Sequence, residues 1–437
     1  MISFFKKSSN YFFAVEHDRI LDKKDIRTLS WLFGNSSLLK EKKLTGSFIG
    51  PLKEMTTPWS TNAVEICNNV GIDGIKRIEI LKKDKDSFDP MTEANYLNPD
   101  QDVFIVTKKP ENVIFIDDLK KYNDEEGLAL SQEEIEYLNE VSRRLNRKLT
   151  DSEVFGFSQV NSEHCRHKIF NGEFILDGKK MNSSLFHMIK KTSKINSKNL
   201  ISAYKDNVAF ISGPEIELFT TELKDKPDYY VKRKIKSSIS LKAETHNFPT
   251  TVEPFSGAAT GSGGEIRDRM AGGQASFPLA GSAVYMTSYP RTTDSKPWEK
   301  NQIKKEWLYQ DPKDILIKAS NGASDYGNKF GQPLINGSVF TFEHSEENHN
   351  LGYDKVIMLA GGIGFGKENE SKKKKISDGD YVVVLGGDNY RIGMGGGAVS
   401  SVNTGEFKNK IELNAVQRSN PEMQKRVANV IRALGEE

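Results

Sequence analysis

The clearest candidates for a chemical role in this sequence are three polar side chains at alternate positions, Lys242, Glu244 and His246. They follow a β-like run at residues 239–241, so a continuing strand would project all three from one face. A cation, a carboxylate and an imidazole side by side can hold a nucleotide phosphate, bind Mg²⁺ and accept a proton. The pattern also fits a solvated strand face with an incidental ion pair.

A glycine-rich stretch begins 13 residues after Glu244. In a loop conformation, its backbone N–H groups could approach phosphates closely, while its last two side chains could serve a substrate phosphate and Mg²⁺. Composition alone is weak evidence, because glycine-rich loops are common. The predicted loop comprises Gly257, Ala258, Ala259, Thr260, Gly261, Ser262, Gly263, Gly264, Glu265, Ile266, Arg267 and Asp268.

Residues 161–168 read Asn-Ser-Glu-His-Cys-Arg-His-Lys and form a second polar concentration. Its donors could meet phosphate, and the imidazole of His164 could move protons near neutral pH. A structural zinc site is disfavoured because the chain's other cysteine, Cys67, stands alone in the sequence. An ordinary polar helix end is the other interpretation.

Two further glycine-rich runs only approximate nucleotide-binding motifs. Residues 361–367 have the spacing of a phosphate-binding loop, but Glu368 stands where a Ser or Thr would bind Mg²⁺. Residues 393–398 fit the permissive dinucleotide pattern without a convincing helix after them. Neither is predicted to be a nucleotide site.

The secondary-structure elements that must position these residues are predicted to be helices first and then strands. Ser131 with Glu134, and Thr150 with Glu153, match the capping-box pattern and predict two helices in a hairpin. β-like runs separated by glycine follow, at residues 239–241, 283–286, 355–359 and 381–385, with a weaker candidate at 411–413. Asn420 and Pro421 predict the start of a final helix.

These patterns predict an α+β and α/β multidomain protein. Residues 1–125 read as a small α+β domain, 126–195 as a helical linker, and 196–370 as an α/β domain. The lysine-rich run 371–375 reads as a solvated linker rather than a nucleic-acid patch, because no aromatic residues interleave with it. Residues 371–437 read as the start of another domain, which we expect to be incomplete.

Bulk composition limits the function classes. The 437 residues carry a net charge of +2, with 37% hydrophobic and 28% charged residues, so no overall attraction to nucleic acid or membrane is predicted. No window of about 20 apolar residues could span a bilayer, and two cysteines are too few for a disulfide framework. We expect a cytoplasmic protein.

Four segments, read in order, resemble the phosphoribosylformylglycinamidine synthase family, in its large single-chain form. They are residues 161–171, 244–268, 321–331, and 395–401 leading to 416–418. The resemblance implies a synthetase half of the aminoimidazole ribonucleotide synthetase type, a helical linker and a separate glutaminase domain. It also implies a ligase that uses ATP and Mg²⁺ to convert formylglycinamide ribonucleotide to the amidine with glutamine-derived ammonia.

The same resemblance implies residue roles. His164 matches an active-site residue of the linker and His246 the presumed proton acceptor. Nucleotide-contacting positions match His167 and Lys242, together with the glycine-rich segment, and magnesium ligands match Glu244 and Asp268. Substrate contacts match Thr245, Asn247, Arg267 and Gln417. Phe248 stands where many relatives have histidine, and a phenyl ring cannot replace an imidazole donor.

The expected glutaminase nucleophile, a cysteine at a glycine-flanked turn, is missing, since Cys67 and Cys165 lie in other contexts. The ammonia is therefore expected to come from a glutaminase domain outside this sequence, and a homodimer is expected to bury the synthetase surface. A non-catalytic nucleotide-binding or assembly subunit is the main alternative. A kinase of the selenophosphate or thiamine-phosphate type is a third, disfavoured by the cluster around His164.

Overall fold

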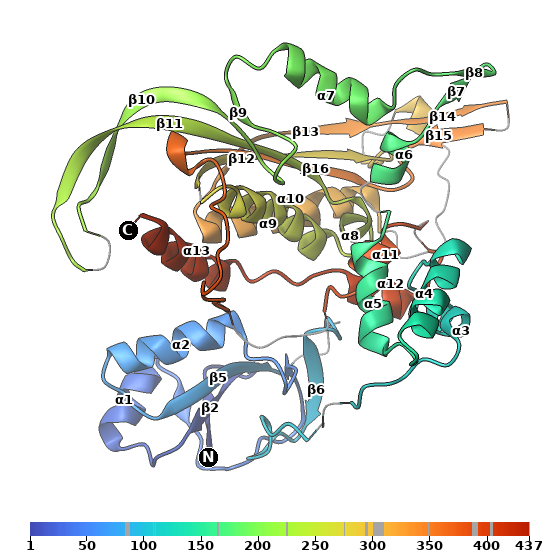
Figure 1. Cartoon of the computed structure of the whole chain (residues 1–437). Coiled ribbons are helices and arrows are strands. Elements are labelled where there is room, and N and C mark those ends of the chain that lie inside the picture. Colours follow the sequence, from blue (N-terminus) through green and yellow to red (C-terminus); the bar gives the residue numbers. More distant parts are fainter. Residues whose placement is uncertain are drawn as a thin grey trace. The chain divides into compact units, whose positions relative to one another are not determined.

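The computed structural model describes residues 1–83, 88–107, 109, 111–163, 166–223, 226–274, 276–292, 296–299, 310–347, 349–386, 392–402 and 405–436. The candidate site residue His164 and its neighbour Cys165 lie outside these ranges. The chain forms two compact units, which are residues 1–112 and residues 113–386 with the described residues after 391. Figure 1 labels their elements.

The first unit is a six-stranded antiparallel sheet with two helices. Its strands lie in the order β3-β1-β2-β5-β4-β6. Helix α1 begins at a capping box formed by Asp22 and Asp25, and α2 begins at Thr57 with proline in its first turn. The elements are β1 (Ile2–Lys6), β2 (Tyr11–His17), α1 (Lys23–Leu32), β3 (Ser37–Leu38), β4 (Ser47–Pro51), α2 (Pro58–Asn69), β5 (Ile75–Lys82) and β6 (Glu93–Leu97).

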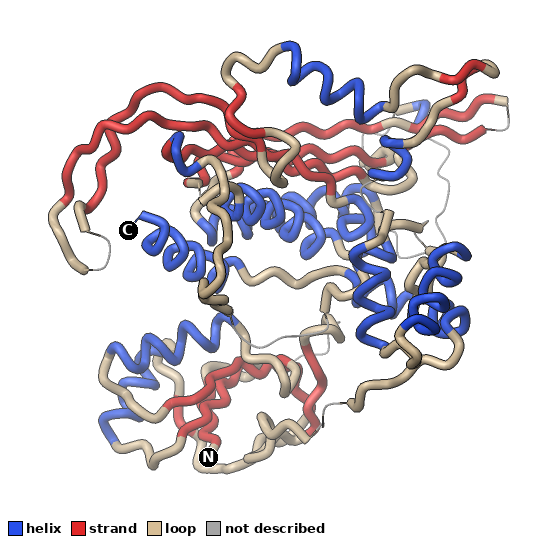
Figure 2. The backbone as a smooth tube through the Cα atoms, in the orientation of Figure 1, coloured by secondary structure: helices blue, strands red, loops and turns tan. Residues whose placement is uncertain are grey.

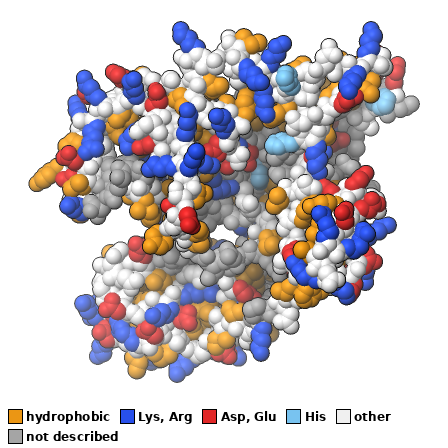
Figure 3. Space-filling model, in the orientation of Figure 1, with side chains coloured by type: hydrophobic (Ala, Val, Ile, Leu, Met, Phe, Trp, Pro, Cys, Tyr) orange, Lys and Arg blue, Asp and Glu red, His pale blue; other side chains and the backbone are white. Residues whose placement is uncertain are grey.

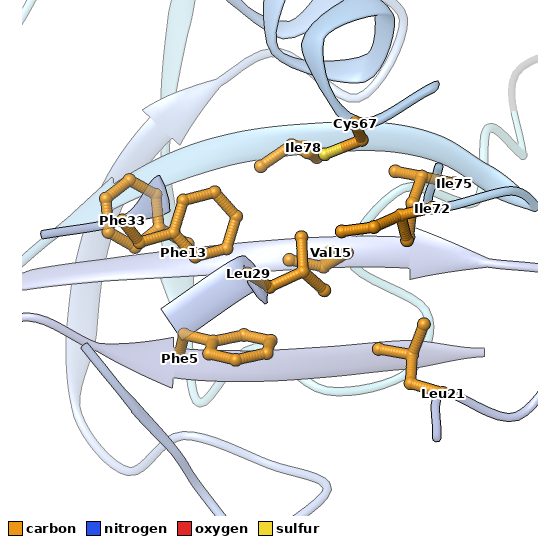
Figure 4. Packing of buried hydrophobic residues seen from close by; sticks show 10 residues of the cluster. All are labelled: Phe5, Phe13, Val15, Leu21, Leu29, Phe33, Cys67, Ile72, Ile75 and Ile78. Carbon is orange, nitrogen blue, oxygen red and sulfur yellow. The ribbon is translucent and has the colours of Figure 1, made fainter. Parts of the chain in front are cut away.

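Alternate residues of this sheet enter two hydrophobic clusters. Phe5, Phe13 and Val15 belong to one cluster, whereas Phe4 and Phe12 belong to the other. In the first cluster the rings of Phe13 and Phe33 stack with centroids 4.3 Å apart (Figure 4). Successive residues of each strand are buried on opposite faces of the sheet. Because both faces are covered, these strands read as nearly continuous apolar runs.

The second unit begins with helices. The capping boxes at Ser131 and Thr150 are both formed, which confirms the two helix starts predicted from the sequence. Leu138 and Val154 lie in the shared core of this helical region. Its elements are α3 (Leu119–Glu126), α4 (Gln132–Arg144), α5 (Asp151–Val160), α6 (His167–Asn171), β7 (Ile175–Leu176), β8 (Lys179–Lys180) and α7 (Leu185–Ile195).

A six-stranded mixed sheet follows, with order β13-β12-β16-β11-β10-β9, antiparallel except between β12 and β13. Helices α9 and α10 cover one face, and the paired β10 and β11 continue beyond the sheet as a curved ribbon (Figure 2). The elements are β9 (Leu200–Ser202), β10 (Ala209–Thr221), β11 (Tyr230–Thr245), α8 (Asn247–Val252), α9 (Pro254–Ala271), β12 (Phe277–Thr287), a 3₁₀ turn (Pro297–Glu299), α10 (Pro312–Phe330), β13 (Leu334–Thr341), β14 (Glu343–Glu346), β15 (His349–Gly352), β16 (Ile357–Lys367) and a second 3₁₀ turn (Glu368–Glu370).

The glycines of residues 361–367 belong to strand β16, so the rejection of a phosphate-binding loop here is confirmed. They permit close approach of α9. A Cβ at Gly362 would lie 2.4 Å from a Glu265 carboxylate oxygen, and one at Gly364 would lie 2.8 Å from Arg269. The glycine pattern therefore reflects packing of a charged helix face against a strand.

Two predicted strands after residue 370 are wrong. Residues 381–385 form no regular element, and the side chains of Tyr381 and Val382 are 95% and 93% exposed. A strand needs a hydrogen-bonded neighbour, and the described residues provide none for this run. Residues 411–413 lie in a helix, which joins the other late elements α11 (Gly396–Val399), α12 (Asn409–Ala415) and α13 (Pro421–Glu436).

The start of the final helix is confirmed, because the Asn420 side chain accepts a hydrogen bond from the amide of Met423. The mixed α and β architecture also confirms the predicted fold class. Acidic and basic side chains are interspersed over much of the face shown in Figure 3. Among the described helices, none combines the length and the apolar character needed to cross a membrane.

Candidate active site

A cation and two carboxylates meet where β11 passes α9. The Lys242 ammonium lies 2.7 Å from Asp268 Oδ2 and 3.8 Å from Glu244 Oε2. All three side chains are partly buried, with exposed fractions of 18%, 27% and 29% respectively. The structure thus brings together three residues that the sequence singled out on two separate elements.

Burial and charge act against each other on Glu244. Burial, the larger effect, raises the pKa of its carboxyl, and neighbouring Asp268 adds to this effect, whereas Lys242 lowers the pKa. Any further cation nearby would stabilise the charged form of this carboxylate. The group is therefore suited to bind positive charge.

These residues fit a magnesium ion. Mg²⁺ prefers carboxylate oxygens and is commonly held by one or two of them together with substrate phosphates. The Lys242 ammonium already stands as a cation between the carboxylates of Glu244 and Asp268. Among the described residues, no group of three His, Cys, Asp or Glu side chains is arranged to hold a metal.

His246 lies just beyond the end of β11, where it precedes the short helix α8. Its backbone N–H donates to the Met358 carbonyl at 2.8 Å, and a Cβ added at Gly261 would lie 3.0 Å from His246 Cβ. Burial, with a smaller contribution from Arg267, lowers the imidazole pKa to about 4. The ring is therefore neutral near pH 7 and able to accept a proton.

The predicted glycine-rich loop is wrong, because its residues form the middle of helix α9. The amide of Gly257 donates to the Glu253 carbonyl at 2.8 Å, and the following amides are used in the same way by the helix. Such amides cannot cradle a phosphate. The glycines instead let α9 pack closely: a Cβ at Gly257 would lie 2.3 Å from the Pro249 carbonyl carbon, and one at Gly264 would lie 2.9 Å from Glu244 Oε1.

Within this segment, only the last two residues, Arg267 and Asp268, have partly exposed side chains. The other members are buried, and burial removes the surface that a direct nucleotide contact would need. They are Gly257, Ala258, Ala259, Thr260, Gly261, Ser262, Gly263, Gly264, Glu265 and Ile266.

Glu265 takes part in a buried network instead. Arg269 donates to Glu265 at 2.8 Å and to the Ile363 carbonyl at 2.8 Å, and Gln332 hydrogen-bonds to both charged side chains. Glu265 and Arg269 are 1% and 0% exposed. This network fixes α9 against β16 and against the segment that follows α10. It thereby fixes the position of Asp268, which lies between Glu265 and Arg269 in the sequence.

Two residues that sequence reasoning missed contact Arg267. Gln424, on α13, accepts a hydrogen bond from Arg267 Nη1 at 3.1 Å and a second from the hydroxyl of buried Tyr326. Tyr326 lies within the family-like segment 321–331, which was a usable signal. Gln424 carries no such signal, because it lies in an ordinary amphipathic helix.

The remaining predicted site residues have other surroundings. Asn247 Oδ1 accepts from the Met358 amide at 3.1 Å, while Thr245 is exposed at the end of β11. His167 lies on α6 with its ring 6.0 Å from that of Phe186. Gln417 is exposed, and a Cβ added at Gly393 would lie 2.5 Å from its Cγ. The described contacts do not join His167 or Gln417 to Lys242.

Phe248 has a structural explanation. Its ring is 2% exposed and packs with Val252, Val399 and Val416. An apolar ring at this position therefore joins α8 to the segment that carries α11 and α12. The buried ring also has no surface for a substrate contact.

Distant family-like segments meet near α11. The Glu163 amide donates to Ser401 Oγ at 3.1 Å, and a Cβ at Gly397 would lie 2.9 Å from Ser162 Oγ. The run before His164 is thus anchored on residues 395–401, which the sequence analysis had placed in a separate domain.

Comparisons with known proteins match one segment in each of the two compact units. Residues 10–97 match the family described as formylglycinamide ribonucleotide amidotransferase N-terminal, and residues 119–168 match the formylglycinamide ribonucleotide amidotransferase linker domain. The second match covers α3, α4 and α5, the helical region that precedes the candidate site.

Solved structures with a weaker likeness include Thermotoga maritima PurL complexed with FGAR, with 22% identity and a TM-score of 0.39, covering 69% of this chain and 37% of that chain. The same protein complexed with ATP gives 21% identity and a TM-score of 0.36, covering 69% of this chain and 36% of that chain. At these scores the likeness carries no argument.

The sequence of a curated relative aligns along most of the chain. Phosphoribosylformylglycinamidine synthase of Schizosaccharomyces pombe is 39% identical over 445 aligned residues, which cover 91% of this chain and 33% of the relative. The chain thus spans about a third of that relative's length. By this alignment and the two domain matches, the chain is similar to the phosphoribosylformylglycinamidine synthase family.

Proposed function

We propose that this chain carries the ATP-binding and ribonucleotide-binding part of an ATP-dependent ligase that converts formylglycinamide ribonucleotide to formylglycinamidine ribonucleotide. The observation that carries the proposal is the group formed by Lys242, Glu244 and Asp268 in a chain that is similar to this family. A lysine and two carboxylates at one point suit a magnesium-bound nucleotide better than they suit a structural ion pair.

The reaction transfers the γ-phosphoryl group of ATP to the carbonyl oxygen of the glycinamide group, leaving ADP. Ammonia then attacks the activated carbon, the carbon–oxygen bond breaks, and phosphate leaves as the amidine forms. Lys242 would hold the ATP phosphates as a point charge, and Arg267 would bind an anionic group of the ribonucleotide. Mg²⁺, held by Glu244 and Asp268, would supply neutralising charge when bound.

His246 is the proposed proton acceptor for the attack of ammonia. Its low pKa keeps the imidazole neutral near pH 7, and its position one residue after β11 places it beside the same helix as Asp268. Thr245, the last residue of β11, and Asn247, the first residue of α8, complete the proposed substrate-binding segment. His164, His167 and Gln417 remain proposals from family resemblance.

The ammonia source is proposed to be a glutaminase domain carried outside this chain. Cys67 is 1% exposed, and burial raises its thiol pKa to about 11, so it is a poor nucleophile near neutral pH. Its free thiol also suits the cytoplasmic location that we propose for the enzyme. The domain divisions at residues 125, 195 and 370 are retained as part of the proposal.

A homodimer is proposed through the exposed edge strand β13. Ile335, Val339 and Phe340 on this strand are 66%, 55% and 52% exposed, and an apolar edge of this kind favours pairing with another strand. A monomeric mass by light scattering at micromolar concentration would contradict the dimer.

Titration calorimetry tests the proposed function. The purified chain is titrated with Mg-ATP and then with formylglycinamide ribonucleotide, beside a Glu244→Ala/Asp268→Ala variant. A Glu215→Ala/Glu217→Ala variant removes two exposed carboxylates from β10 as a matched control. Binding that only the first variant loses supports the proposal. Equal binding by all three proteins, or no binding by a folded native chain, would count against a site in this chain.

A further inference from the structure

The inference concerns α13, the final described helix, and rests on the proposed role of Arg267 in binding substrate. Gln424 of this helix accepts a hydrogen bond from Arg267 Nη1 at 3.1 Å. The guanidinium of arginine can only donate, so the atom that faces it must be the side-chain oxygen of glutamine. The contact therefore fixes both the glutamine amide and one side of the guanidinium.

A second donor converges on the same oxygen. The hydroxyl of Tyr326, on α10, also hydrogen-bonds to Gln424 Oε1. Tyr326 is fully buried, and its ring packs in a cluster with Ile266, Phe330 and Ala428. Because one carbonyl oxygen has two lone pairs, both donors can be satisfied at once. Gln424 is thus held by a rigid ring as well as by the arginine.

The helix that carries Arg267 is shaped for this arrangement. Gly263 lies one turn before Arg267, and a Cβ there would be 2.6 Å from Arg267 Nη1 and 2.6 Å from Tyr326 Cε2. Any larger residue would displace one of the two groups. An ion pair from Lys329 to Glu422, at 3.8 Å, also joins α10 to α13 close to Gln424.

We propose that Gln424 is a positioning residue that orients the Arg267 guanidinium toward an anionic group of the ribonucleotide substrate. In this arrangement Gln424 holds Nη1, and donors of the guanidinium that Gln424 does not hold would meet the ligand. Helix α13 then contributes to substrate affinity without touching the substrate itself. Helical propensity and packing of α13 do not require glutamine at this position, so the hydrogen bonds are its distinguishing role.

The test uses Gln424→Leu, which removes the acceptor, and Gln424→Glu, which keeps an acceptor oxygen. Glu422→Gln is the matched control, because Glu422 lies on α13 like Gln424 but contacts Lys329 of α10 instead of Arg267. The first measurement needs no ligand: phenylglyoxal modification of arginine, followed at the Arg267 peptide by mass spectrometry.

The expected result is a rate at Arg267 about tenfold higher in Gln424→Leu, corresponding to the loss of a hydrogen bond from a charged donor. Gln424→Glu should restore slow modification, and Glu422→Gln should leave it unchanged. A rate at Arg267 that Gln424→Leu does not change would overturn the inference. Thermal unfolding midpoints separate this local effect from general loosening.

The second measurement is calorimetric. Formylglycinamide ribonucleotide should bind Gln424→Leu about tenfold more weakly, whereas Mg-ATP should bind it as it binds the native chain. Unchanged ribonucleotide affinity in this variant would also overturn the inference. If the native chain binds no ribonucleotide while the modification rates change as expected, Gln424 does position Arg267, and it is the proposed function that fails.

Discussion

The Nζ atom of Lys242 lies 2.7 Å from Asp268 Oδ2 and 3.8 Å from Glu244 Oε2, so the chain itself supplies a cation between the two proposed metal ligands. A divalent ion at this point must share or displace that contact. The same lysine is proposed to bind ATP phosphates once released from the carboxylates. This relationship predicts opposite effects on two ligands.

Lys242→Met should therefore bind Mg²⁺ more tightly and ATP more weakly than the native chain, each by about tenfold, or 1.4 kcal/mol. Removing the ammonium leaves two uncompensated carboxylates but takes a charge from the phosphates. Titration calorimetry with MgCl₂ alone and then with Mg-ATP measures both affinities. Lys232→Met, at an exposed position of the same strand, is the control. Affinities that fall in parallel would exclude the displacement.

The packing role of the α9 glycines can be measured as stability. Gly257→Ala places a methyl group 2.3 Å from the backbone of Pro249, which cannot move as a side-chain end can. We expect a loss of about 1–3 kcal/mol or more in the free energy of unfolding, as for other overpacked sites. Urea unfolding followed by circular dichroism is the measurement.

Gly156→Ala is the matched substitution in helix α5, where an added Cβ meets nothing within 4 Å. Because alanine is the better helix former, this variant should gain about 0.5–1 kcal/mol. A Gly257→Ala variant as stable as Gly156→Ala would show that α9 can shift away from α8, and that the close contact is not required.

The buried pair Glu265 and Arg269 predicts a large and asymmetric energetic effect. Arg269→Met would leave Glu265 buried without its cation, which costs about 3–5 kcal/mol in comparable pairs. Arg269→Met/Glu265→Leu removes both charges and should recover much of that loss. Thermal and urea unfolding of the single and double variants give the coupling energy.

An exposed pair provides the contrast. Arg233→Met breaks an ion pair with Glu222 at 3.5 Å on the β10–β11 ribbon, where both side chains are largely solvated. This variant should change stability by about 1 kcal/mol at most. If Arg269→Met were equally mild, the network would not be what fixes α9 against β16.

Sequence patterns predicted the elements that depend on local rules. The capping residues Ser131, Thr150 and Asn420 all begin helices, because their hydrogen bonds involve only the next few residues. Residues 381–385 have equally clear β-forming character but no regular structure. Strand formation depends on a distant neighbour, which local composition cannot supply.

In the candidate site, too, local patterns predicted some features, whereas features that depend on distant contacts were missed. Alternation along β11 correctly placed Lys242 and Glu244 near each other, because side-chain direction in a strand follows from spacing alone. The glycine-rich run from Gly257 was interpreted as a loop, since glycine lowers helix propensity. Tertiary packing reversed that preference: α9 lies too close to the backbone of α8 at Gly257 and to the Glu244 side chain at Gly264 for a larger residue. Gln424 could not be found by spacing, because its partners Arg267 and Tyr326 are about 100 or more residues away.

The N-terminal cap of α5 predicts a specific pH dependence of stability. Glu153 forms a two-pronged contact with Arg147, at 2.6 and 2.9 Å, and accepts a hydrogen bond from the Thr150 amide. The Arg147 contact, followed by the Thr150 bond, lowers the pKa of Glu153 from 4.5 to about 2. Since the folded pKa is the lower one, the stabilisation is present above about pH 4.5 and is lost as pH falls toward 2.

Glu153→Gln keeps an acceptor for the cap but loses the charged contact. It should be less stable than the native chain at pH 6, and the difference should shrink progressively as pH falls below 4.5. Urea midpoints at pH 6, 4.5, 3.5 and 3 give the comparison. Glu140→Gln, which breaks the looser 3.7 Å pair with Arg144 on α4, is the control and should change stability only slightly at pH 6. A gap for Glu153→Gln that stays constant over the same range would mean that the contact with Arg147 does not stabilise the fold, despite its geometry.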